Sequence, residues 1–269
     1  MERSADIGVF GGSGFYTLLE DVEEVVVDTP FGSPSDKIAL ARFGDKSVAF
    51  LPRHGSKHTI PPHKINYRAN IWAMHSLGVR QIIAPCAVGS LQPDLAPGEF
   101  VVCDQFVNRT WGRQDTFFEG PDVRHVSAAD PYCPRLRQQI VDTAAKLGIS
   151  VRPEGTMVVI NGPRFSTRAE SREYSGHGWH VIGMTGYPEA MLAREMEICY
   201  ANISLVTDYD AGLEGRADIP PVTHGAVLEV FAQNVERVKR LLLGVIEEMP
   251  LLETRDCICA SALSSTESD

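Results

Sequence analysis

Long apolar runs are missing from this 269-residue chain, and no segment is long enough to span a bilayer. The first six residues lack the basic end and the apolar core of a signal peptide, so we expect a cytoplasmic protein with no membrane contact. A basic excess is missing too, because 25 Lys and Arg stand against 35 Asp and Glu, for a formal net charge of -10. Since nucleic-acid phosphates select basic surfaces, this charge argues against a nucleic acid as partner.

Complete nucleotide-binding motifs are also missing. Residues 7–10 read as a buried strand that runs into Gly11-Gly12-Ser13-Gly14. This pattern lacks the last glycine of the dinucleotide fingerprint, the G-K-[ST] of a Walker loop and the last glycine of a nucleophile elbow. What remains is a glycine turn whose backbone N–H groups and Ser13 hydroxyl can surround a small anion. Taken alone, a tight turn without a ligand explains the stretch equally well.

Closely spaced cysteines are scarce. Of the six cysteines only Cys257 and Cys259 form a close pair, and C-x-C without a second pair is a weak metal signal. A redox or disulfide role for this pair stays open, and the other four cysteines read as small buried apolar side chains. A magnesium site at Asp208 and Asp210 lacks a third carboxylate. The sequence therefore predicts no bound metal.

The composition that is present, 43% hydrophobic and 22% charged, is typical of a globular protein with a substantial core. Strand-like and helix-like patterns alternate from end to end, without a linker or a repeat. We expect one α/β domain over residues 1–250, with helices on both faces of a mixed central sheet, and a flexible tail over residues 251–269. The strands are predicted at 7–10, 23–28, 38–43, 47–51, 80–87, 99–104, 155–160, 181–185 and 198–206, and the helices at 65–77, 134–147, 169–176, 189–196 and 222–248.

Chemically suited side chains follow several predicted strands, where ligands bind in such domains. Arg53 and His54 suit an anion, since arginine offers a rigid bidentate fork. Asp208 and Asp210 follow a buried strand, in which residues i and i+2 face one side. Taken alone, the first pair also fits a solvated basic loop and the second a turn or helix cap. Their shared position at strand ends favours an anion site beside paired carboxylates, which suits phosphate attacking a heterocycle-bearing substrate.

Six longer motifs then stand in order along the chain: GGSG at 11–14, PRHG at 52–55, NYRANIWA at 66–73, GTM at 155–157, GPRFSTRAE at 162–170 and TDYD at 207–210. Between Gly8 and about Leu243 the chain resembles the purine nucleoside phosphorylases of the trimeric type. Within that family it is most similar to the members that cleave 5′-methylthioadenosine. The resemblance implies an α/β/α sandwich and a homotrimer or a dimer of trimers.

The resemblance also implies the reaction. Inorganic phosphate, as co-substrate and without a cofactor, would cleave the N-glycosidic bond of 5′-methylthioadenosine or a closely related 5′-modified adenosine. The products would be adenine and 5-methylthioribose 1-phosphate. Protonated Asp208 would hydrogen-bond purine N7, Asp210 would accept from the 6-amino group, and His54 would join them as a catalytic residue. His125 would reach the 5′ region of a neighbouring subunit's site. The implied phosphate ligands are Ser13, Arg53, His54, Cys86, Ala87 and Thr185, and the implied nucleoside contacts are Phe165, Ser166, Met184, Asp208, Asp210, His125 and His224.

Two positions depart from the family pattern. Cys86 stands where the methylthioadenosine-cleaving members commonly have Thr, which weakens one phosphate contact. His224 stands where they have a small apolar residue, and its ring suits a polar 5′ group. Three alternatives follow: a broader phosphorylase for adenosine or 6-oxopurine nucleosides, a nucleosidase that uses water, and a non-catalytic binding protein. Asp210 argues against 6-oxopurines, and the anion-binding residues argue against water as nucleophile.

Overall fold

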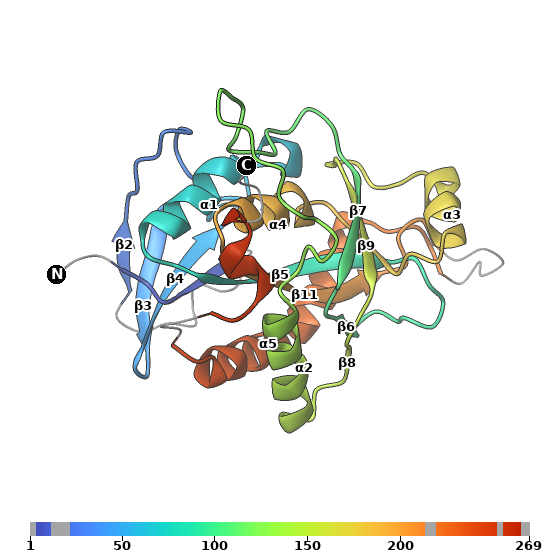
Figure 1. The fold of residues 1–269 in the computed structure, drawn as a ribbon. Coiled ribbons are helices and arrows are strands. Elements are labelled where there is room, and N and C mark those ends of the chain that lie inside the picture. The colour runs from blue at the N-terminus through green and yellow to red at the C-terminus, as the bar shows by residue number, and fades with distance from the viewer. Residues whose placement is uncertain (1–3, 12–21, 213–218, 252–254, 265–269) are drawn as a thin grey trace.

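A mixed β-sheet runs through the middle of the molecule with helices on both faces (Figure 1). The computed structural model describes residues 4–11, 22–212, 219–251 and 255–264. Helices α1 and α4 cover one face of the sheet, and α2 and α5 cover the other. The predicted α/β sandwich with a mixed central sheet is therefore confirmed.

The helices are α1 (Tyr67–Ser76), α2 (Pro134–Lys146), α3 (Arg168–Gly176), α4 (Gly186–Glu195) and α5 (His224–Glu248), with short 3-10 helices η2 (Pro62–Lys64) and η3 (Ile258–Ser261). The strands are β1 (Ile7–Gly11), β2 (Glu23–Val25), β3 (Ile38–Phe43), β4 (Lys46–Pro52), β5 (Gln81–Ser90), β6 (Phe100–Val101), β7 (Gln105–Arg109), β8 (Val151–Arg152), β9 (Thr156–Ile160), β10 (Val181–Gly183) and β11 (Cys199–Asp208). All five predicted helices exist, and their ends differ from the prediction by three residues or fewer.

Side-chain caps explain where several helices begin. The Asn66 side chain accepts from the backbone N–H of Ala69 at the start of α1. Helix α3 has a complete capping box, in which Thr167 and Glu170 satisfy one another's backbone N–H groups. These caps occupy donors that a helix end otherwise leaves without a partner, so the loops before α1 and α3 are fixed in place.

Strand β11 lies between the two hydrophobic cores, and its side chains point alternately into one and the other. Cys199, Ala201, Ile203 and Leu205 pack in the core under α2 and α5, whereas Tyr200 and Val206 belong to the core under α1 and α4. Between them Asn202 and Ser204 are buried polar residues, only 2% and 0% exposed. The face of the sheet beneath α1 and α4 is thus polar at its centre, whereas the opposite face is apolar.

Strand β5 pairs with β1, β10 and β11, and it is longer than predicted. The sequence suggested a turn at residues 88–90, but β5 continues to Ser90 because β11 pairs with it over nearly its whole length and β10 pairs with its last two residues. Along the opposite edge of β5, strand β1 pairs only with Ile82 and Ile83. Among the described strands none pairs with residues 84–88 on that side, so backbone groups there are free of ladder bonds.

The C-terminal segment also differs from its prediction. Residues 255–264 fall in the part assigned to a flexible tail, yet they contain η3, and Cys259 is 1% exposed. The Leu263 backbone N–H donates to Glu197 Oε1 at 3.2 Å. This part of the tail is therefore packed on the body. Across the described residues, no helix combines the length and the apolar character needed to cross a membrane.

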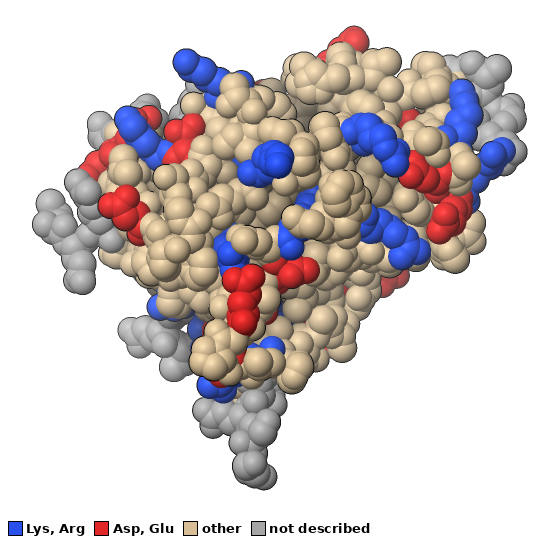
Figure 2. Space-filling model, turned by 90° about the horizontal axis from the view of Figure 1, so that it is seen from above, with Lys and Arg blue, Asp and Glu red and all other residues tan. Residues whose placement is uncertain are grey.

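Charged side chains are mixed on the surface. Figure 2 shows Lys and Arg interspersed with Asp and Glu on the face seen from above. That face has no continuous basic strip of the kind that nucleic-acid phosphates select.

Candidate active site

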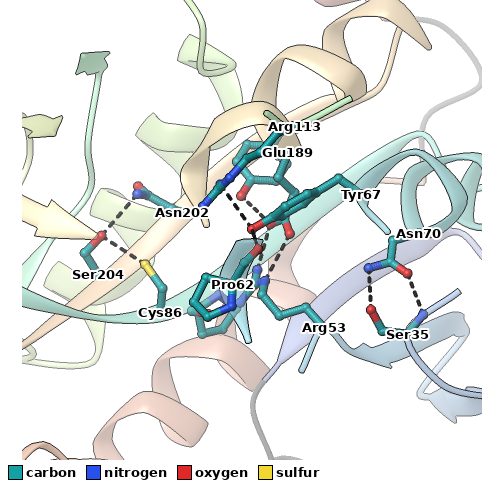
Figure 3. Close-up of polar contacts among 12 residues, drawn as sticks. Ser35, Arg53, Pro62, Tyr67, Asn70, Cys86, Arg113, Glu189, Asn202 and Ser204 are labelled. Atoms are coloured by element: carbon teal, nitrogen blue, oxygen red, sulfur yellow. Dashed lines mark hydrogen bonds and ion pairs between the residues drawn. The ribbon is translucent and has the colours of Figure 1, made fainter. Parts of the chain in front are cut away.

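Arg53 is the central cation of the candidate site and directly follows β4. It is 3% exposed. Its Nε and Nη2 donate to the two carboxylate oxygens of Glu189 at 3.0 and 2.7 Å, and Nη1 donates to the Pro85 carbonyl at 3.0 Å (Figure 3). A guanidinium has five N–H donors, so two remain for a ligand. The Arg53 side chain reaches the edge of β5 that pairs with no other described strand, and Cys86 lies nearby.

Glu189 holds Arg53 in this orientation. It is 1% exposed, and Tyr200 donates a further hydrogen bond to its Oε1 at 2.6 Å. The pKa of Arg53 stays raised despite the opposing effect of burial, because Glu189 lies against it. The guanidinium is therefore charged and fixed before any anion arrives.

His54 differs from the expectation that it donates to an anion. Its Nδ1 lies 2.9 Å from the Ile60 carbonyl, which can only accept, so Nδ1 carries the proton. Burial lowers the pKa of His54 to about 4, opposed by the Ile60 carbonyl and reinforced by Arg53. At neutral pH the ring is uncharged, and its Nε2 is an acceptor. It suits a phosphate oxygen that bears a proton.

The remaining predicted phosphate residues lie at neighbouring strand ends. The Arg53 backbone N–H donates to the Gly11 carbonyl at 3.3 Å, which places the start of the glycine turn next to it. Ser13 lies outside the described residues. Thr185 follows β10 at the start of α4, is 8% exposed, and does not cap that helix with its side chain. Cys86 is half-buried, and its Sγ lies 3.4 Å from the Ser204 hydroxyl.

Asp208 and Asp210 meet at the end of β11, although not for the predicted reason. A register shift falls between Val206 and Asp208, and Asp210 lies beyond the strand with a φ of 46°. The Asp210 N–H donates to Asp208 Oδ1 at 2.8 Å, so a turn and not strand alternation joins the two carboxylates. A Cβ on Gly89 of β5 would stand 2.9 Å from Asp208 Oδ1 and 3.3 Å from Asp210 Cβ, which shows how closely β5 approaches both.

The two carboxylates differ in their surroundings. Burial raises the pKa of Asp208 to about 6, although the Thr207 hydroxyl donates to its Oδ2 at 2.7 Å and opposes the shift. Burial also raises the pKa of Asp210, and the nearby Ser171 and Ser166 hydroxyls oppose it. Asp210 Oδ2 and Ser166 Oγ are both buried without a hydrogen-bond partner within the described chain. Buried polar atoms of this kind indicate a ligand that supplies the missing bond.

The predicted apolar and 5′ residues lie on other segments of the chain. Met184 is half-buried, and a Cβ on Gly162 would touch its Sδ at 2.6 Å, so the loop after β9 packs on it. Phe165, in the same loop, is 36% exposed. His224 is the first residue of α5. Its ring lies 6.3 Å from that of His58, which stacks on His54 at 4.6 Å. His125 is exposed in the loop between β7 and α2.

A protein-family model described as the phosphorylase superfamily matches residues 6–247. The chain belongs to the phosphorylase superfamily.

Similar proteins match over at least 96% of their own length. The chain is 51% identical to a purine nucleoside phosphorylase of Streptomyces coelicolor, over 98% of this chain and 96% of that protein. It is also 51% identical to an S-methyl-5'-thioadenosine phosphorylase of Nitrosopumilus maritimus, over 99% and 100%. A structure of the Schistosoma mansoni methylthioadenosine phosphorylase with adenine superposes with a TM-score of 0.89 at 39% identity, covering 97% and 98% of the two chains. The expected family is confirmed.

Three residues of the candidate site were missed from the sequence. Glu189 was assigned only to a helix, although a buried arginine requires a carboxylate partner. Gly89 was assigned to a turn. Arg113 lay in a predicted loop, but its Nη2 donates to the Asn161 and Met184 carbonyls at 3.0 and 2.9 Å. That side chain therefore joins the loop after β7 to the ends of β9 and β10. Its Nη1 also donates to the Tyr67 hydroxyl at 3.2 Å (Figure 3).

Proposed function

We propose that this protein cleaves the N-glycosidic bond of 5′-methylthioadenosine with inorganic phosphate. The observation that carries the proposal is the pair Asp208 and Asp210. The pKa of the Asp208 carboxyl is raised to about 6, and Asp210 has a buried oxygen without a partner among the described residues. The buried cation Arg53 lies at the neighbouring edge of β5. An anion site next to a proton donor and a free acceptor suits phosphate and a 6-aminopurine.

The chemistry follows from these positions. As the bond between N9 and C1′ breaks, its electron pair moves to the purine and the sugar acquires oxocarbenium character. Protonated Asp208 donates a hydrogen bond, or its proton, to purine N7 and stabilises the departing base. A phosphate oxygen then forms the new bond to C1′. The base takes up one proton in total, which balances the proton that monohydrogen phosphate loses, and that proton restores Asp208 through solvent. The phosphate, now bonded to C1′, leaves as the sugar 1-phosphate dianion.

Arg53 and His54 divide the phosphate contacts in this proposal. The two free N–H groups of Arg53 donate to charged oxygens, while Nε2 of neutral His54 accepts a hydrogen bond from the hydroxyl of monohydrogen phosphate. Thr185 supplies a hydroxyl, and Cys86 and Ala87 supply backbone at the free edge of β5. Ser13 is the predicted further donor from the glycine turn.

Asp210 selects the base in this proposal. The Asp210 oxygen that has no partner accepts a hydrogen bond from the 6-amino group of adenine. The nearby Ser166 hydroxyl accepts a second one. A 6-oxopurine would place a second acceptor against it, so a buried oxygen would be left without a hydrogen bond. Phe165 and Met184 supply apolar surface for the rings.

The test is base release from 5′-methylthioadenosine, adenosine and inosine, each measured with and without phosphate. We expect release of adenine that requires phosphate and is fastest from 5′-methylthioadenosine. Release without phosphate would indicate a nucleosidase, and preference for inosine would overturn the role of Asp210. Preference for adenosine would make His224 the residue that sets the 5′ specificity, and His224→Ala should then shift the preference towards the methylthio group.

The site is expected to be complete only in an oligomer. We propose a homotrimer in which His125 contacts the 5′ region of a neighbouring site. Two exposed side chains on the loop after β7 support the proposed subunit contact. They are His125 and Trp111, and Trp111 is 75% exposed.

A further inference from the structure

Four cysteines from three distant parts of the chain meet in one cluster. Cys133 precedes α2, Cys199 begins β11, and Cys257 and Cys259 lie in the C-terminal segment at η3. Their four Sγ atoms all lie within 4.8 Å of one another, and all four are free thiols. Three are buried, and Cys257 is half-buried. The sequence showed only one close pair, and the fold supplies the second.

We propose that Cys133, Cys199, Cys257 and Cys259 bind one zinc ion in a closed tetrathiolate site that fastens the C-terminal segment to the body of the protein.

The sulfur spacing suits a tetrahedral metal site. A zinc–sulfur bond is about 2.3 Å, so the sulfurs of a tetrahedral site lie about 3.8 Å apart. The sulfurs of Cys199 and Cys257 lie 3.3 Å apart, well beyond the roughly 2.05 Å of a disulfide bond. Four thiolates in a tetrahedron are the ligand set typical of zinc or of iron–sulfur centres.

The backbone fixes the ligands before a metal arrives. The Cys133 N–H donates to the Tyr200 carbonyl at 2.8 Å, and the Cys199 N–H donates to the Arg80 carbonyl at 2.9 Å. In the C-terminal turn the Ala260 N–H donates to the Cys257 carbonyl at 3.0 Å. Cys133 and Cys199 are thus held by bonds to distant residues, whereas the bond in the C-terminal turn is local, so the ion would add a link between that turn and the body.

Positive charge next to the cluster suits a dianionic site. Four thiolates and one zinc ion carry a net charge of two minus. Arg135 Nη2 lies 3.7 Å from Cys199 Sγ, and Arg135 Nε is buried without a hydrogen-bond partner among the described residues. Cys133 is also the N-cap of the 13-residue helix α2, whose positive end stabilises a thiolate.

The site is structural and separate from the proposed phosphorolysis. Cys199 and Asp208 stand at opposite ends of β11, about 30 Å apart at the usual strand rise. All four tetrahedral positions are filled by protein sulfur, which leaves none for a substrate or water.

The first test is the metal content of the untagged full-length protein, expressed with zinc in the medium and dialysed. We expect one zinc per chain by plasma mass spectrometry, and six thiols per chain after unfolding in a chelator. Less than a tenth of an equivalent of zinc, with four of the six cysteines paired as disulfides, would overturn the proposal. One equivalent of iron with visible absorption would show that the four thiolates hold iron, and it would overturn the assignment of zinc.

Matched variants locate the ion. Cys133→Ser and Cys257→Ser should each lose most of the zinc and unfold at a lower temperature. Cys103→Ser removes a buried cysteine outside the cluster and should keep one equivalent. Full zinc content in both cluster variants would rule out this site, and the wild-type measurement stands even if a variant fails to fold. Turnover at 25 °C is read separately, so failure of the zinc proposal leaves the proposed reaction untouched.

Discussion

At the scale of single residues, the environment of Asp208 sets when it can donate a proton. Its pKa is raised to about 6 by burial. Only the protonated form is a general acid, so kcat/KM for the nucleoside should decline as pH rises above about 6. Asp208→Asn should lower kcat by roughly 10²–10⁴-fold and remove that decline. A variant with wild-type turnover would exclude the role of proton donor.

The raised pKa of Asp208 also predicts how the stability of the protein depends on pH. A raised pKa means that the folded protein holds this proton more tightly than the unfolded chain between pH 3.8 and about 6. The stabilisation by the proton is complete below this window and is lost as pH rises through it. Asp208→Asn should therefore be more stable than the wild type at pH 7, by up to about 3 kcal/mol. Urea unfolding at pH 4 and pH 7 measures the difference, which should nearly vanish at the lower pH.

Glu189 illustrates a positioning residue. Glu189→Gln leaves the buried Arg53 without its counter-charge, so we expect a loss of about 3–5 kcal/mol in unfolding free energy. The KM for phosphate should rise about tenfold, with little change in the KM for the nucleoside. Glu236→Gln is the matched control, because the Glu236 side chain is 82% exposed and its ion pair with Lys239 contributes under about 1 kcal/mol. An unchanged or lower phosphate KM in folded Glu189→Gln would contradict the positioning role.

At the scale of elements, the close approach of β5 to the end of β11 places both carboxylates. A Cβ at Gly89 would stand 2.9 Å from Asp208 Oδ1 and 2.9 Å from Ile182 Cγ2. Gly89→Ala should therefore displace Asp208, lower kcat at least about tenfold, and cost about 1–3 kcal/mol in stability. Gly176→Ala is the control: a Cβ there meets nothing within 4 Å, so steady-state rates should not change. Full activity of Gly89→Ala would show that the strand tolerates the added methyl group.

At the scale of the whole molecule, the proposed trimer predicts that subunits complement each other. Light scattering should give three times the chain mass of 29.5 kDa. His125→Ala should raise the nucleoside KM, whereas His177→Ala, another exposed histidine, should not. Co-expressed Asp208→Asn and His125→Ala chains should form some sites with both native residues and recover part of the low-KM activity. No recovery in mixed trimers would place His125 outside the neighbouring site.

The order of the helices and of most strands could be predicted because local patterns decide it, but β7 and β8 were not among the predicted strands. The spacing of apolar residues indicated the helices. The caps at Asn66 and Thr167 explain where α1 and α3 begin. Arg53, Asp208 and Asp210 were identified because they follow predicted strands, where ligands bind in such domains, and because they lie in motifs of the family. Strand β5 was predicted too short, since pairing with β10 and β11 extends it and the sequence of β5 carries no sign of those partners.

The sequence by itself determined the fold class, the family and most candidates for the site. Only the tertiary structure decided their partners: Arg53 meets Glu189 across 136 positions, and Cys199 meets Cys257 across 58. It also decided that His54 is a neutral acceptor and that a turn joins the two aspartates. The physical reason is that burial and pairing depend on which segments the sheet brings together. One segment's side-chain pattern does not contain that information.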